Sequence, residues 1–232
     1  MYFQELYIDP NPHNHELNPV LWDNNQLRKD VRLQLLKIAR HFALYLNVPI
    51  LNLKDVTLSG SSAGYNYSDY SDIDLHLVVS KTNGNDELFT AKKNLYNNEH
   101  DLAIANIPVE LYVQPADQPH HSAGIYSILD DKWIIEPVHE EPTIDPKDIK
   151  AKARNYAGKI NFAMRSGDID KCRATMDELK RLRKAGLETG GEQSVENLAF
   201  KLLRSRGQIS KLSKYITKLE SAELSLGEHN EN

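Results

Sequence analysis

Two carboxylates, Asp72 and Asp74, stand one residue apart at the start of an apolar run that ends at Val79. Side chains of a β-strand alternate between its two faces, so we expect both carboxylates on one face and Ile73 in the core. Adjacent carboxylates repel each other unless a positive charge lies between them. In proteins that charge is commonly Mg²⁺, which also binds water and substrate phosphates. The pair therefore predicts a site for Mg²⁺ (or Mn²⁺) that acts on phosphates.

A turn of small residues precedes this strand. The apolar residues 56–58 lead through Ser59 into Gly60, Ser61 and Ser62. Small side chains let backbone N–H groups and hydroxyl groups approach phosphates closely. We therefore expect Gly60, Ser61 and Ser62 to bind the phosphates of a nucleotide.

A third carboxylate is carried by a later strand-like run, residues 107–113, in which Glu110 is the one acidic residue. Strand alternation places Glu110 on the face of Tyr112 and opposite Val109 and Leu111. Glu110 is the acidic side chain that this run can offer to a site. The alternative is an exposed acid on an edge strand.

At these positions the sequence resembles the nucleotidyltransferase superfamily of DNA polymerase β. The signature of that superfamily is a hydrophobic residue, Gly and Ser, then a spacer, and then Asp-hydrophobic-Asp at the start of a strand. In this sequence Leu58, Gly60, Ser61 and residues 72–74 fit the signature. The resemblance implies an α+β fold, in which a mixed sheet similar to the polymerase β palm has flanking helices and precedes a C-terminal helical bundle. It also implies that Asp72, Asp74 and Glu110 are catalytic, although Asp is usual at the third position.

The resemblance implies a two-metal reaction. Asp72 and Asp74 would bind both divalent ions, and Glu110 would bind the catalytic ion and help to deprotonate the acceptor. Attack on the α-phosphorus of an NTP would transfer an NMP and release pyrophosphate. Catalysis would come mainly from positioning and charge neutralisation.

A further resemblance covers most of the chain. Residues 17–22, the spacer 64–72 and residues 196–201 are similar to predicted nucleotidyltransferases of tailed phages. This likeness names no substrate.

Periodicity predicts the elements that position these residues. We expect strands at 55–59, 72–79 and 107–114, a hairpin within 124–135, and helices at 27–47, 86–98, 148–165, 169–185, 194–205 and 208–226. Ser194 and Gly207 are the expected start and stop signals of the helix between them. In the helix at 86–98 we expect Leu88, Phe89 and Leu95 to point inward. Residues 81–85 are expected to form a turn.

This order of elements suggests four segments. They are an irregular leader at 1–25, a catalytic domain at 26–140, a helical substrate-binding domain at 147–226 and a polar tail at 227–232. The charge changes along the same order, since residues 1–146 carry net −11 and residues 147–218 carry net +10. A basic helical half can hold a triphosphate or an RNA or other polyanionic acceptor. It can equally be a solvated helix face.

Three further residues are candidates for nucleotide binding. Lys201 and Arg204 lie one turn apart on an otherwise apolar helix, with the cluster at 180–184 as the alternative phosphate site. Tyr67 in the spacer can stack on a nucleobase or pack the loop against its own domain. His76 shares the face of the two aspartates, where we expect a buried, hydrogen-bonded histidine because Mg²⁺ prefers oxygen ligands.

Composition restricts the class of protein. With 40% hydrophobic and 8% aromatic residues among 232, the chain can bury a core. The single cysteine, Cys172, excludes an intramolecular disulfide. No signal peptide or membrane span is indicated, so we expect a cytoplasmic protein, in the host cytoplasm if a phage encodes it. The oligomeric state is not indicated.

The leading hypothesis is thus a metal-dependent nucleotidyltransferase that uses an NTP. The acceptor is left open among an RNA end, a protein hydroxyl, a small molecule and a second nucleotide. One alternative is a catalytically silent nucleotide-binding or antitoxin-like regulatory protein of the same fold, although all three acids are present. Another is a metal-dependent nuclease or phosphatase, which the Gly-Ser turn disfavours.

Overall fold

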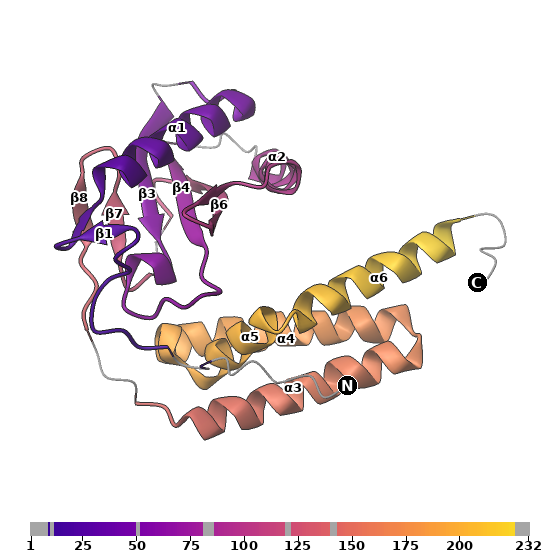
Figure 1. Cartoon of the computed structure of the whole chain (residues 1–232). Coiled ribbons are helices and arrows are strands. Elements are labelled where there is room, and N and C mark those ends of the chain that lie inside the picture. Colours follow the sequence, from indigo (N-terminus) through magenta and orange to yellow (C-terminus); the bar gives the residue numbers. More distant parts are fainter. Residues whose placement is uncertain are drawn as a thin grey trace. The chain divides into compact units, whose positions relative to one another are not determined.

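The computed structural model describes residues 9, 12–49, 52–80, 86–118, 122–139 and 143–225. The chain divides into two compact units. The first, within residues 12–141, is called the sheet unit; the second, within residues 142–232, is called the helical unit (Figure 1).

The sheet unit is built on a mixed six-stranded sheet with the order β5-β6-β4-β3-β7-β8. Strands β4 and β6 run parallel, and the other neighbouring pairs are antiparallel. Because parallel strands cannot be joined by a tight turn, helix α2 makes the crossover between β4 and β6. The strands are β3 (Leu53–Ser59), β4 (Ile73–Val79), β5 (Ala103–Ile104), β6 (Ile107–Pro115), β7 (Ile125–Ser127) and β8 (Lys132–Ile135).

The two faces of this sheet differ in polarity. Alternate residues of the central strands, such as Leu58, Leu75 and Leu111, are fully buried on one face. They form a core with Leu35 and Phe42 of helix α1 (Lys29–Leu46). Their neighbours in sequence point to the opposite face, where the polar side chains lie.

Helix α2 (Asp86–Glu99) confirms the predicted helix but not all of its inward residues. Phe89 packs against the core, whereas Leu88 and Leu95 are 51% and 50% exposed. The inward stripe instead contains Tyr96, whose hydroxyl lies 2.6 Å from Nδ1 of His41 on α1. The prediction for the two leucines was wrong because it followed hydrophobicity instead of the three- and four-residue steps from Phe89.

Part of the segment expected to be an irregular leader belongs to the sheet unit. Trp22 lies in the short pair formed by β1 (Trp22–Asp23) and β2 (Gln26–Leu27), and it is buried with Leu17 and Leu21 in the core. Its indole N–H donates to the Ser62 carbonyl over 2.8 Å. This segment therefore supports the loop that follows β3.

The helical unit packs four helices around its own core. They are α3 (Pro146–Ser166), α4 (Ile169–Gly190), α5 (Val195–Ser205) and α6 (Gln208–Leu224). Ser194 caps α5 by accepting a hydrogen bond from the Asn197 N–H, and Gly207 separates α5 from α6 with φ of 69°, as predicted. The core residues include Ile149, Tyr156, Leu179, Leu198, Leu203 and Leu212.

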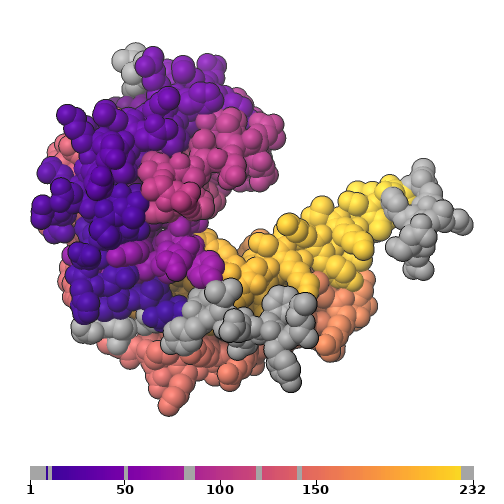
Figure 2. Space-filling view, viewed as in Figure 1, coloured from indigo at the N-terminus to yellow at the C-terminus, as the bar shows by residue number. Residues whose placement is uncertain are grey.

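The mixed sheet with flanking helices, followed by C-terminal helices, confirms the predicted α+β fold class. Near its C-terminal end α6 is exposed, with Leu224 at 84% (Figure 2). In the described part of the chain no helix has the length and apolar content needed to cross a membrane. The turn expected at 81–85 and the tail at 227–232 lie outside the described residues.

Candidate metal and nucleotide site

Three carboxylates meet on the polar face of the sheet. Asp74 of β4 stands opposite Glu110 in the parallel β4–β6 pair, and Asp72 comes just before β4. One carboxylate oxygen from each of the three residues lies within 4.8 Å of those of the other two. All three side chains are half-buried. The structure thus brings together the three acids that the resemblance implied to be catalytic.

These carboxylates, called the acidic triad below, fit a divalent cation. Their donor set is oxygen alone, which suits Mg²⁺ or Mn²⁺ and not a metal that prefers nitrogen or sulfur. Among the residues that the structure describes, this is the one group of three or more metal-ligating side chains close enough to share an ion. Three negative charges at this spacing repel one another, so binding of a cation removes an electrostatic cost.

Gly60 allows the loop after β3 to approach the triad. Its φ of 74° and ψ of −161° fall in a region that residues with a Cβ rarely adopt. A Cβ at this position would collide with Oδ2 of Asp74. The Gly60 N–H donates to Oγ of Ser122 over 3.1 Å. The absence of a side chain is therefore what lets the backbone lie against the Asp74 carboxylate.

The two serines after Gly60 hold the other end of the spacer. Ser62 is buried, and its hydroxyl donates to the Asp72 carbonyl over 2.6 Å. The Ser61 hydroxyl, which is half-buried, donates to Oγ of Ser71 over 2.9 Å. In this arrangement Ser62 fixes the backbone of Asp72, and Ser61 is the more accessible of the two hydroxyl groups.

A row of aromatic side chains continues from the triad along the same face. His76 Nε2 lies 3.2 Å from Oγ of Ser59, and its ring stacks on Tyr112 with centroids 4.8 Å apart. The expected hydrogen bond of His76 is thus present. Burial raises the pKa of the Tyr112 hydroxyl far above its usual range, and the charges of Asp74 and Glu110 and a hydrogen bond to Glu110 raise it further. Tyr112 therefore stays protonated beside the Glu110 carboxylate.

Lys93 of α2 completes this row, with Nζ 4.9 Å from the centre of the Tyr112 ring. The sequence reasoning missed both Lys93 and Tyr112 as site residues. Tyr112 follows Glu110 by two positions, so strand alternation alone placed it on the site face. Lys93 carried no such signal, because its place depends on how α2 docks beside β6.

The remaining candidates are Tyr67 in the spacer and two basic residues of the helical unit. Tyr67 is half-buried in the spacer, where its carbonyl accepts a hydrogen bond from Asn14 Nδ2 over 2.8 Å. Its pKa is raised by burial and, less strongly, by the charge of Glu16. Lys201 and Arg204 lie on α5 of the helical unit, where Lys201 Nζ is 3.8 Å from a Glu192 carboxylate oxygen. They do not belong to the same compact unit as the triad.

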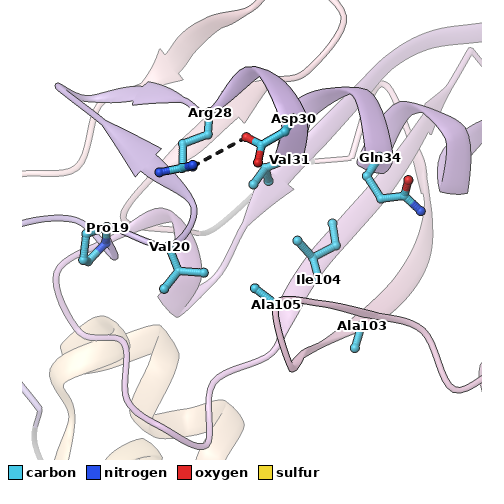
Figure 3. A pocket seen from close by; sticks show the side chains of 9 residues that line it. All are labelled: Pro19, Val20, Arg28, Asp30, Val31, Gln34, Ala103, Ile104 and Ala105. Carbon is cyan, nitrogen blue, oxygen red and sulfur yellow. Dashed lines mark ion pairs between the residues drawn. The ribbon is translucent and has the colours of Figure 1, made fainter.

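Three pockets lined by described residues of the sheet unit are large enough for a small molecule. One, of about 550 Å³, is lined by residues within 23–32 and by Asp131, and it contains no residue of the acidic triad. Two more lie in the same unit. One, of about 670 Å³, contains no residue of the acidic triad (Figure 3). Arg28 and Asp30 form an ion pair of 3.5 Å among its side chains, so the charges there are already matched. The other, of about 530 Å³, lies between α2 and β6 and includes Lys93 and Tyr112. The pocket between α2 and β6 is therefore the one adjoining the candidate site.

No family model and no curated protein matches the sequence. Among solved structures, a STING-associated CdnE c-di-GMP synthase from Capnocytophaga granulosa is similar over 85% of this chain and 83% of that chain. The sequence identity is 13% and the TM-score is 0.22. A likeness at this TM-score assigns no function to the chain.

Proposed function

We propose that this protein is a metal-dependent nucleotidyltransferase, which moves an NMP from an NTP to a hydroxyl acceptor and releases pyrophosphate. The observation that supports this proposal is the convergence of Asp72, Asp74 and Glu110 beside a glycine whose backbone lies against Asp74. A carboxylate cluster alone is compatible with several kinds of phosphate chemistry. The loop that begins at Gly60 and carries the half-buried Ser61 hydroxyl adds a place for the outgoing phosphates.

The side chains have distinct roles in this reaction. Bound Mg²⁺ or Mn²⁺ would neutralise the triphosphate and make the α-phosphorus more electrophilic. Asp72 and Asp74 hold that positive charge, and Gly60 and Ser61 contact the outgoing phosphates. Glu110 receives the proton of the acceptor hydroxyl, whose oxygen forms a bond to the α-phosphorus as the bond to pyrophosphate breaks. Tyr112, two positions further along β6, lies on the same face as Glu110.

The experiment that tests this function uses each labelled NTP with Mg²⁺ or Mn²⁺ and a panel of acceptors. The panel contains RNA, DNA, the protein itself, nucleotides and a cell lysate. We expect label from the α-phosphate to enter one acceptor class with release of pyrophosphate. Release of orthophosphate instead would indicate a phosphatase. Metal-dependent NTP binding without turnover across the panel would favour the catalytically silent alternative. The likeness to tailed-phage proteins stays a prediction.

We also propose that Lys201 and Arg204 contribute to binding of the NTP or a polyanionic acceptor, supported by the net +10 of residues 147–218. Neutralising them as Lys201→Gln, Arg204→Gln should raise the apparent KM severalfold and flatten its dependence on salt. The control is Lys214→Gln, Lys218→Gln, the same charge change on exposed positions of α6. The measurement is the apparent KM as a function of ionic strength for the wild type and both double variants. Equal curves for the two double variants would contradict a specific role of Lys201 and Arg204.

A further inference from the structure

Neighbouring segments bond to the edge of β6 that faces α2 as far as Leu111. The Val109 N–H at this edge donates to the Leu102 carbonyl over 2.8 Å. Two positions further along β6, the backbone of Leu111 is bonded by the side chain of Asn97. This side chain accepts from the Leu111 N–H over 3.2 Å and donates to the Leu111 carbonyl over 3.0 Å. Alternate residues of a strand direct their backbone groups to the same side. The N–H and carbonyl of Val113 therefore face this edge as well, where Val113 lines the pocket of about 530 Å³.

This pocket, called the α2–β6 pocket below, combines a cation with backbone and apolar contacts. Its volume falls in the range of about 300–1,000 Å³ that is typical of small-molecule sites. Lys93 brings a positive charge, Thr90 a hydroxyl and Val113 a backbone N–H. Phe89 and Pro115 supply apolar surface. The full lining is Phe89, Thr90, Lys93, Tyr112, Val113, Pro115, Asp117 and Gln118.

The α2–β6 pocket adjoins the acidic triad on one defined side. Tyr112 follows Glu110 by two positions on β6 and therefore points to the same face, and Lys93 lies over the Tyr112 ring. Because the strand order is β3-β4-β6, the loop beginning at Gly60 flanks the triad from β3, and the pocket flanks it from β6. The loop side is taken by the outgoing phosphates of the NTP in the proposed function. The pocket side is left for the other reactant.

We propose that the α2–β6 pocket is the acceptor subsite and that it takes a small phosphate-bearing alcohol, such as a nucleoside monophosphate. Its phosphate binds the Lys93 ammonium and the Val113 N–H, and its hydroxyl points toward Glu110. In the reaction that hydroxyl oxygen bonds to the α-phosphorus, pyrophosphate leaves, and the proton passes to Glu110. This inference rests on the proposed function and names the substrate class of its site.

Direct binding of nucleoside monophosphates tests the inference without turnover. Each of AMP, GMP, CMP and UMP is titrated calorimetrically into the full chain with Mn²⁺ and a non-hydrolysable NTP analogue. We expect at least one to bind, and Lys93→Met to weaken that binding at least about tenfold, because a charge-assisted contact is lost. Lys93→Met should change the affinity for the NTP analogue by less than about twofold. Lys92→Met is the matched control, since Lys92 neighbours Lys93 on α2 and does not line the pocket.

Four results separate the outcomes. Lys93-dependent binding in a protein that never turns over an NTP supports a monophosphate site at the pocket and refutes the proposed function. Equal monophosphate binding by wild type and Lys93→Met overturns the subsite. Absence of monophosphate binding in the wild type also overturns it. Loss of affinity for the NTP analogue instead of the monophosphate assigns Lys93 to the donor, and this too overturns the subsite.

Discussion

Replacing Asp74 by asparagine is expected to lower nucleotidyl transfer at least about 100-fold while the sheet unit stays folded. An amide has the shape of the carboxylate but carries no charge, so it cannot hold a cation against the triphosphate. The same result is expected for Asp72→Asn. Because both side chains are half-buried and lie on the polar face, the apolar core is not touched.

Thermal unfolding provides a second readout of Asp74→Asn that does not depend on turnover. Millimolar Mn²⁺ with an NTP should raise the Tm of the wild type, since the ligand binds the folded state and removes repulsion within the triad. Asp74→Asn should reduce that rise. Asp101→Asn, the same change at an exposed position of the sheet unit, should leave both transfer and the rise intact. An equal rise in wild type and Asp74→Asn would mean that the ions bind elsewhere.

Gly60→Ala is expected to lower nucleotidyl transfer as well, although Gly60 is not part of the triad. The added methyl group collides with the Asp74 carboxylate and meets a backbone conformation with φ of 74° that costs about 1–3 kcal/mol for residues with a Cβ. The collision can be removed only if the loop or the Asp74 side chain moves. We therefore expect transfer to fall at least about tenfold, together with a lower Tm and a weaker response to Mn²⁺.

Gly158→Ala is the matched control for Gly60→Ala. Gly158 lies within α3, and a Cβ there meets nothing within 4 Å. Alanine should stabilise this helix by about 0.5–1 kcal/mol, and activity should be unchanged. Activity of Gly60→Ala equal to that of the wild type would show that the backbone at this loop need not approach Asp74.

The acidic triad was accessible from sequence because the period of a strand is two. Asp72, Asp74 and Glu110 each followed from alternation against buried neighbours. Their mutual placement required the parallel register in which Asp74 stands opposite Glu110, and no pattern within either strand specifies that register. The assignment came instead from resemblance to a known family, and the structure then brought the three side chains together.

Features that depend on docking between elements were not predicted. Lys93 is one such case, since its approach to Tyr112 is set by the place of α2 beside β6. The pair β1–β2 is another, because two-residue strands have too few positions to show alternation. Leu88 and Leu95 show the converse error, in which hydrophobic residues lie on the exposed face of a helix. The nucleotide-binding roles of Tyr67, Lys201 and Arg204 stay predictions.

The bidentate contact of Asn97 with Leu111 has a consequence for solubility and assembly. A sheet edge with unpaired N–H and carbonyl groups is a template on which another chain can add a strand. Here a side chain of α2 occupies the place that such a strand would take, and Pro115, which has no N–H, ends β6 a few residues later. The helix that joins the parallel strands thus also protects the edge of β6 against strand addition by a second molecule, while leaving the stretch at Val113 accessible to a small ligand.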